Sequence, residues 1–346
     1  MAELHEPGGH LKATLEGQHR ELSRLVADDS ATRAAERLHD ASRIFIVGTG
    51  TSYHGALAGQ FMLRSAGRDA WAIRAFEFAN YPPRLDSHDG LILLSHRGSK
   101  RFSRDSLEHF KVVGDRWLVI TGEGSPLEGE GVVRTVEQEK SPVHTASHTA
   151  AMLRLAQIAS TLGRPSWQGA LARVASAVTT ALELRDQVAS ALSRIDLDET
   201  LYFVGGGPAR ATACEGALKI REAAHTVSAE AHDVEGILHG PLISVLPQQA
   251  AILISQSGAS LERTQEVAAA MIDIGVTVVA VGADAGAIAS TSAIATPAID
   301  EVLAPIVNVV PLQWLAYEAA RRLEVDADSF RRDEEPYSSA QSRYVL

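Results

Sequence analysis

The feature that most limits how this chain can fold is a pair of turns that occurs twice. The apolar run "RIFIVG" (43–48) leads into a glycine-rich turn, and so does "LYFVG" (201–205). In each half a second apolar run ends in a serine turn, "SHRGSK" (95–100) and "SQSGAS" (255–260). The glycine turn and the serine turn are 47 residues apart in the first half and 50 in the second. This repeated spacing indicates an internal duplication.

Both halves alternate apolar runs with helical stretches, which predicts an α/β fold of two doubly wound parallel sheets, each flanked by helices. Other strands are expected at 70–75, 90–95, 116–121 and 277–282. Helices are expected at 11–38, with Leu11, Leu15, Leu22 and Leu25 on one face, at 53–65, and over 143–194 with a break near 163–165. We expect five segments: an N-terminal helical segment (1–40), a first subdomain (41–165), a connecting helix (166–195), a second subdomain (196–325) and a C-terminal tail over the site (326–346).

Composition excludes several kinds of partner. A net charge of −11 without any basic block argues against nucleic acid and against an anionic membrane surface. The single cysteine, Cys214, cannot form an internal disulfide, and no uncharged apolar stretch of about 18 residues occurs. We therefore expect a soluble, cytoplasmic protein with neither nucleic-acid nor membrane partners.

The turns "GTGTS" (48–52) and "SHRGSK" (95–100) have the composition of an anion site. Ligands of open α/β sheets bind at the carboxyl ends of strands, where glycine turns leave backbone N–H groups free and hydroxyls can donate to phosphate. Neither turn matches the GxxxxGK[ST] or GxGxxG nucleotide fingerprint. For either turn alone, a helix cap is the better explanation. Together the two turns favour a site for an anion.

Longer stretches resemble the SIS (sugar isomerase) superfamily, and most closely the isomerase domain of glucosamine-6-phosphate synthases, over residues 15–330. The resemblance rests on "GTGTSYHGALAGQ", "CEGALKIREAAHTVSAEA", "LHGPL", "LISQSG" and "DEVLAPIVNVVPLQWLAYEAA". It implies two flavodoxin-like SIS subdomains, a phosphosugar substrate and no metal or organic cofactor.

By this resemblance, the phosphate site would comprise Gly50, Thr51, Ser52, Ser95, His96, Arg97, Ser99, Lys100 and Thr145. The family's serine turn usually reads Ser-Gln-Ser-Gly-Glu-Thr, whereas this chain has Arg97 and Lys100 at the second serine and the threonine. Arginine can bind phosphate through two N–H groups, and lysine acts as a point charge. Alternatively, both cations face solvent in an ordinary basic loop.

Glu215, Lys219 and Glu222 are spaced at i, i+4 and i+7, which places them on one helical face. An exposed Glu–Lys–Glu ladder would have the same spacing. By resemblance, however, Glu222 is the base that moves a proton between C1 and C2, and Lys219 is a polar partner near the open-chain sugar. Burial and the neighbouring cation would act in opposite directions on the pKa of a carboxyl here.

His239 of "LHGP" would be the acid–base group that opens the sugar ring. In the family this histidine reaches into the partner subunit's site, which implies a homodimer. Glu235 precedes His239 by four residues, whereas the family's glutamate precedes its histidine by three, so the resemblance does not assign Glu235 a role.

His144 and His148 are unusual for the family's serine-threonine loop. On a helix, a His-x-x-x-His spacing would place both imidazoles on one face, as in some zinc sites, but no third ligand is evident. Hydrogen bonding to substrate or plain surface exposure accounts for them without a metal.

Two features of the synthases have no counterpart here. The chain starts with Met1 and Ala2 in place of a nucleophilic cysteine, so we expect no glutaminase activity, and its tail has no lysine for a Schiff base, only Gln341 or Arg343 as contacts. We therefore expect a phosphosugar isomerase/deaminase acting on a hexosamine 6-phosphate. A fructosamine-phosphate deglycase and a phosphosugar-binding regulator without catalysis are the alternatives.

Overall fold

The computed structural model describes residues 6–345, which form two compact units with one five-stranded sheet each. The β1–β5 unit comprises Gly17–Glu139, Ala146–Ala175 and the residues from Glu334 onward. The β6–β10 unit comprises the described residues up to Glu16, Lys140–Thr145 and Ser176–Asp333. Because every strand pairing in both sheets is parallel, the predicted α/β class with two parallel sheets is confirmed.

The sheet of the β1–β5 unit has the strand order β2-β1-β3-β4-β5. Its strands are β1 (Arg43–Gly48), β2 (Ala70–Arg74), β3 (Asp89–Leu94), β4 (Trp117–Thr121) and β5 (Val132–Arg134). Its helices are α2 (Ser30–Ala35), α3 (Thr51–Ser65), α4 (Ala75–Asn80), α5 (Arg101–Val113), α6 (Ala146–Gly163) and the C-terminal α12 (Tyr337–Gln341). The strands predicted at 43–48, 70–75, 90–95 and 116–121 are therefore confirmed to within one residue.

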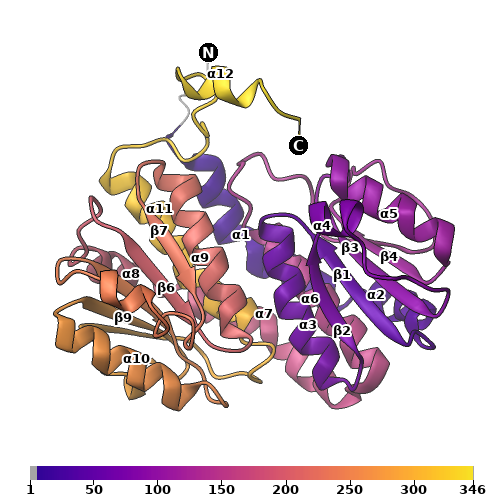
Figure 1. Ribbon diagram of the computed structural model, residues 1–346, viewed down its shortest axis with the longest axis horizontal. Helices are drawn as coiled ribbons and strands as arrows, with labels where there is room; N and C mark the ends of the chain where they lie inside the picture. Colours follow the sequence, from indigo (N-terminus) through magenta and orange to yellow (C-terminus); the bar gives the residue numbers. More distant parts are fainter. Residues whose placement is uncertain (1–5, 346) are drawn as a thin grey trace. The chain divides into compact units, whose positions relative to one another are not determined.

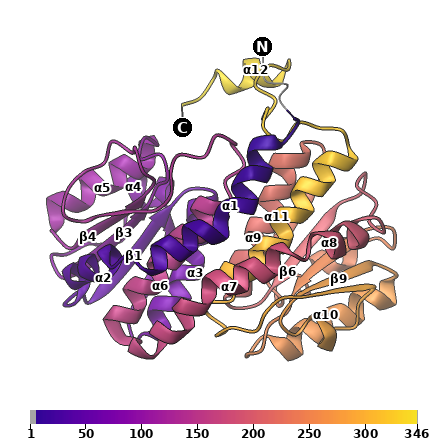
Figure 2. The same ribbon diagram turned by 180° about the vertical axis from the view of Figure 1, so that it is seen from behind.

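Helices cover both faces of this sheet (Figure 1). Phe45 and Val47 of β1 point to the face where Phe78 of α4 and Phe110 of α5 pack, and all four side chains belong to one apolar core. On the other face, α3 and α6 lie side by side, as Figure 2 shows from behind. The β1–β5 sheet is thus buried on both faces, which explains its nearly continuous apolar strands.

The sheet of the β6–β10 unit has the order β10-β9-β8-β6-β7, which is the same topology read from the other edge. Its strands are β6 (Leu201–Gly205), β7 (Ala229–His232), β8 (Ala250–Ile254), β9 (Thr277–Gly282) and β10 (Ser292–Ala295). Its helices are α8 (Arg185–Leu192), α9 (Ala209–Ala224), α10 (Leu261–Ile274) and α11 (Pro305–Arg322). Helices α9 and α11 pack together beside the sheet (Figure 1) in the same way as α3 and α6.

The glycine that ends the leading strand has the same role in both units. A Cβ on Gly48 would lie 2.5 Å from the carbonyl carbon of Ser52, and one on Gly205 would lie 2.4 Å from the carbonyl oxygen of Ala209. Because glycine has no Cβ, the backbone four residues further along the chain can lie against it in each unit. The helix can therefore begin directly after the strand. The duplication predicted from spacing is therefore a duplication of structure.

The N-terminal helix is shorter than expected. Helix α1 (Gly9–Val26) ends well before residue 38, and its four leucines, predicted to share one helical face, are all fully buried. The buried side chain of Arg154 accounts for this end, because its Nη1 donates to the carbonyl oxygens of Leu25 (3.3 Å) and Asp28 (3.2 Å). A cation on the last carbonyls of a helix satisfies groups that lack intrahelical partners.

The helical stretch at 143–194 is broken where the sequence predicts. Helix α6 ends at Gly163, a short 3₁₀ turn spans Pro165–Trp167, and α7 (Gln168–Leu182) follows before α8. No helix among the described residues is both long enough and apolar enough to cross a membrane.

Candidate active site

The first turn lies at the switch point of the β1–β5 sheet. Strands β1 and β3 are neighbours, but the chain leaves β1 towards β2 and leaves β3 towards β4, so ligands are expected beside the turns that follow β1 and β3. Gly50, with φ +55°, precedes α3, and Thr51 and Ser52 are its first residues. Neither hydroxyl caps α3 or bonds another described residue, so the helix-cap interpretation of this turn is wrong and both hydroxyls remain available to a ligand.

Ser95 begins the second turn, directly after β3. Its backbone N–H donates to the carbonyl oxygen of Ile120 (3.0 Å), and its carbonyl oxygen accepts from Thr121 Oγ1 (2.7 Å), so the sheet holds its main chain firmly. The side chain is only 4% exposed, and its Oγ has no hydrogen-bond partner in the part of the chain that the structure describes. Because an unsatisfied buried hydroxyl is costly, this Oγ is suited to bind an oxygen of a ligand.

The cations of this turn differ in exposure. Arg97 and Ser99 are exposed, and Lys100 is half-buried at the residue before α5. The side chain of Lys100, at the N-cap position, makes no capping hydrogen bond to α5. An exposed guanidinium is open to an anion and to water alike, so the role of Arg97 and Lys100 in phosphate binding stays a prediction.

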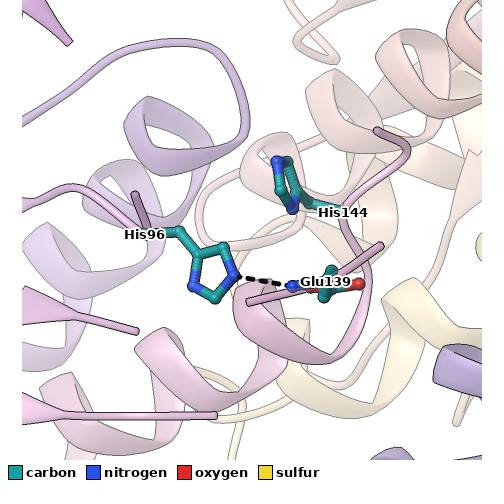
Figure 3. Close-up of side chains that lie close together, drawn as sticks. All are labelled: His96, Glu139 and His144. Atoms are coloured by element: carbon teal, nitrogen blue, oxygen red, sulfur yellow. Dashed lines mark hydrogen bonds between the residues drawn. The ribbon is translucent and has the colours of Figure 1, made fainter. Parts of the chain in front are cut away.

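His96 is held by a residue that sequence reasoning missed. The backbone N–H of Glu139 donates to His96 Nε2 (3.3 Å), as Figure 3 shows, and Glu139 Oε1 accepts from the backbone N–H of Ser147 (2.8 Å) in the first turn of α6. An imidazole nitrogen that accepts a hydrogen bond carries no proton, so this contact places the proton of neutral His96 on Nδ1. Glu139 lies outside every motif that the sequence analysis singles out, and no spacing rule identifies it.

The expected geometry of His144 and His148 is wrong. Helix α6 begins at Ala146, so His144 precedes it and the two imidazoles are not on one helical face. His148 is 3% exposed and packs against Gly55 of α3, which also excludes plain surface exposure for it.

Histidine and carboxylate side chains are common metal ligands. Figure 3 draws three such side chains, those of His96, Glu139 and His144. His144 belongs to the β6–β10 unit, whereas His96 and Glu139 belong to the β1–β5 unit. The expectation that no metal binds to these side chains therefore stays a prediction.

The predicted Glu–Lys–Glu face is formed on α9. Lys219 Nζ lies 3.4 Å from Glu215 Oε1 and makes a close ion pair and hydrogen bond with Glu222 Oε2. Glu215 and Lys219 are fully buried, whereas the side chain of Glu222 is 19% exposed. The alternative of an exposed surface ladder is therefore wrong. Glu222 is the one carboxylate of the three residues that is partly open to solvent.

The two carboxylates keep Lys219 charged. Burial by itself would lower the pKa of the ammonium, but the charges of Glu215 and then Glu222, with their hydrogen bonds, outweigh it and raise the pKa above its ordinary value. A cation that stays protonated at neutral pH can hold the Glu222 carboxylate in one position.

His239 lies in an exposed turn between β7 and β8, with 73% of its side chain accessible. Its Nε2 lies 2.7 Å from Glu235 Oε1. In the family the glutamate precedes the histidine by three residues. Here the spacing is four residues, and it brings Glu235 into contact with His239.

Three predicted residues remain to be described: Thr145, Gln341 and Arg343. Thr145 is fully buried in the β6–β10 unit, where its carbonyl oxygen accepts from Gln313 Nε2 (3.4 Å). Gln341 ends α12, and the exposed Arg343 follows it. Their contacts to substrate stay predictions.

Comparison with known proteins identifies the class. The SIS domain family matches residues 37–160 and 198–321, one match over each sheet. The two parallel sheets and this double match define a protein with paired SIS domains, and the chain belongs to the SIS family.

Individual relatives extend the comparison over nearly the whole chain. A glutamine–fructose-6-phosphate aminotransferase (isomerizing) of Thermus thermophilus is 30% identical over 353 aligned positions, which cover 96% of this chain and 57% of the relative. The C-terminal domain of glucosamine-fructose-6-phosphate aminotransferase from Francisella tularensis superimposes with a TM-score of 0.81 at 20% identity, covering 94% of this chain and 98% of that domain. Glucosamine-6-phosphate deaminase from Thermotoga maritima superimposes with a TM-score of 0.75 at 21% identity, covering 92% and 97%. This chain spans little more than half the length of the aminotransferase.

Proposed function

We propose that this chain is a phosphosugar isomerase/deaminase that acts on a hexosamine 6-phosphate. The observation that carries the proposal is Glu222, a partly exposed carboxylate fixed by the buried ammonium of Lys219. The names of the Francisella and Thermotoga proteins support both the amino-sugar substrate and the release of an amine.

The proposed chemistry is a proton transfer followed by hydrolysis. His239 opens the sugar ring, and Glu222 then takes the proton from C2 of the open-chain aldose and returns it to C1. This step converts a 2-amino aldose into a 2-imino ketose. Addition of water to the imine and loss of ammonia give the ketose phosphate, so no metal, oxidant or organic cofactor is needed.

The hydroxyls of the two turns would bind the phosphate. Thr51 and Ser52 lie at the start of α3, where the helix N-terminus favours an anion, and Ser95 supplies a buried hydroxyl without a partner among residues 6–345. By resemblance, Gly50, His96, Ser99 and Thr145 would also contact the phosphosugar, and so would Gln341 and Arg343 of the tail.

Proton NMR in D₂O tests the proposal directly, with glucosamine 6-phosphate and fructose 6-phosphate as separate substrates. We expect the C1/C2 protons to exchange with solvent and ammonia to be released from the amino sugar. Turnover of amino-acid-linked ketose phosphates instead would support the deglycase. Binding without exchange would support the regulator.

Replacing Arg97 tests the cationic turn. We expect Arg97→Ala to raise the KM for the phosphosugar about tenfold, equivalent to about 1.4 kcal/mol, because an arginine–phosphate hydrogen bond is lost. Arg101→Ala is the matched control, since Arg101 is exposed on α5 and pairs with Asp105 at 3.8 Å. An unchanged KM in Arg97→Ala would show that this guanidinium faces solvent in the working enzyme.

The proposed function includes a homodimer in which His239 contributes to the partner subunit's site. Ile243, which is 92% exposed, and Leu246, which is 47% exposed, follow His239 closely in the chain, and exposed large apolar side chains beside a functional residue favour a protein contact. We expect light scattering to give twice the chain mass. A monomer at assay concentrations would contradict this part of the proposal.

A further inference from the structure

The turn that carries His239 is built to place a glutamate beside it. Asp233 Oδ1 accepts hydrogen bonds from the backbone N–H groups of Glu235 (3.1 Å) and Gly236 (2.7 Å). The backbone N–H of Ile237 then donates to the carbonyl oxygen of Asp233 (3.1 Å), which closes one helical turn. Residues four apart in a helical turn lie on the same side, so Glu235 meets His239.

A second contact fixes the glutamate. Arg263, on α10, donates through Nε to Glu235 Oε2 (2.8 Å), while Glu235 Oε1 lies 2.7 Å from His239 Nε2. The carboxylate therefore uses one oxygen for each partner. The other side of the guanidinium is held by Glu266, which lies one helical turn from Arg263 on α10.

This geometry determines which nitrogen of His239 carries the proton. The hydrogen bond from His239, and then that from Arg263, lowers the pKa of Glu235, so this side chain is an ionised carboxylate at neutral pH. An ionised carboxylate can only accept hydrogen bonds, so the proton between the two groups belongs to His239 Nε2. No group in the described part of the chain bonds to Nδ1.

We propose that Glu235, held by Arg263, is a positioning residue that fixes the Nε2–H tautomer of His239 and leaves Nδ1 as the nitrogen that exchanges a proton with the sugar. The chemistry assigned to His239 rests on the proposed function. The tautomer itself follows from contacts within one unit of this chain. A carboxylate that orients a functional imidazole through its other ring nitrogen is a common arrangement in proteins.

The tautomer can be measured without any substrate. In full-length protein labelled with ¹⁵N in its histidines, a proton–nitrogen correlation spectrum at about pH 8.5, where ordinary imidazoles are neutral, distinguishes protonated from bare ring nitrogens. His239→Gln identifies the signals. We expect wild-type His239 to show a protonated Nε2 and a bare Nδ1, and Glu235→Ala to show a mixture of both tautomers.

The chain offers a matched control in a second histidine–glutamate pair. His232 Nε2 lies 3.0 Å from Glu230 Oε2, so Glu230→Ala should change the signals of His232 and leave those of His239 and the turnover unchanged. Glu235→Ala should lower kcat by about 10- to 100-fold, the range seen when such orienting groups are lost, with little change in KM.

Two results would overturn the inference: an unchanged His239 tautomer in Glu235→Ala, or a mixed tautomer without any fall in kcat. Failure of the proposed function is distinguishable from both. A wild-type protein that turns over no phosphosugar would remove the chemical role of Nδ1, whereas a tautomer that still depends on Glu235 would confirm the positioning.

Discussion

Glu222→Gln is expected to lower kcat by about 10²- to 10⁴-fold while leaving the Kd for the phosphosugar within a few fold of wild type. A carboxamide has nearly the shape of the carboxylate and can still accept a hydrogen bond from Lys219, but it cannot take up a proton. Positioned general bases contribute rate factors of this size. The measurements are the rate of C1/C2 proton exchange in D₂O and calorimetric titration with fructose 6-phosphate.

Glu262→Gln is the control for Glu222→Gln, because it makes the same chemical change at an exposed position in the first turn of α10. Thermal unfolding of each variant shows whether lost activity reflects lost folding. Full exchange activity in Glu222→Gln would remove this residue from the proton transfer. Loss of binding together with activity would instead make Glu222 a ligand of the ground-state sugar.

Lys219→Met is expected to destabilise the protein by about 3 kcal/mol or more. The substitution leaves the fully buried carboxylate of Glu215 without its cation, and removing one partner of a buried ion pair typically costs about 3–5 kcal/mol. The double variant Lys219→Met/Glu215→Gln should recover much of this loss, since no uncompensated charge then remains in the core. Urea unfolding of the single and double variants measures both effects.

The pH dependence of this effect has a definite sign. Because the pKa of Lys219 is raised on folding, its favourable contribution is complete below the unfolded lysine pKa of about 10.4 and is lost as the pH rises through the folded value. The difference in unfolding free energy between wild type and the double variant Lys219→Met/Glu215→Gln, in which no fully buried carboxylate is left to titrate, should therefore be the same at about pH 7 and pH 9.

Lys111→Met is the matched control for Lys219→Met. Lys111 pairs with Glu108 on the surface of α5 (3.0 Å), and surface pairs contribute about 0–1 kcal/mol. Equal losses in the two methionine variants would mean that the buried pair contributes no more than an exposed one.

The sequence by itself determined the parts of the molecule that depend on neighbours in the chain. Apolar runs bounded by glycine and serine turns located the strands near the middle of each sheet, and the helical period placed Glu215, Lys219 and Glu222 on one face. These features follow from backbone periodicity and turn chemistry, which act over a few residues.

The tertiary structure decided the features that depend on distant segments. Strands β5, β7 and β10 have only three or four residues each, too few for a pattern, and they exist because a neighbouring strand pairs with them. The end of α1 is determined by Arg154, more than 120 residues further along the chain.

The same distinction holds for the candidate site. Residue spacing could not show that Lys219 is buried, that Glu139 holds His96, or that Arg263 fixes the glutamate beside His239. Burial and long-range hydrogen bonds determine the charge of a lysine and the tautomer of a histidine, and both arise only when segments far apart in the sequence pack together.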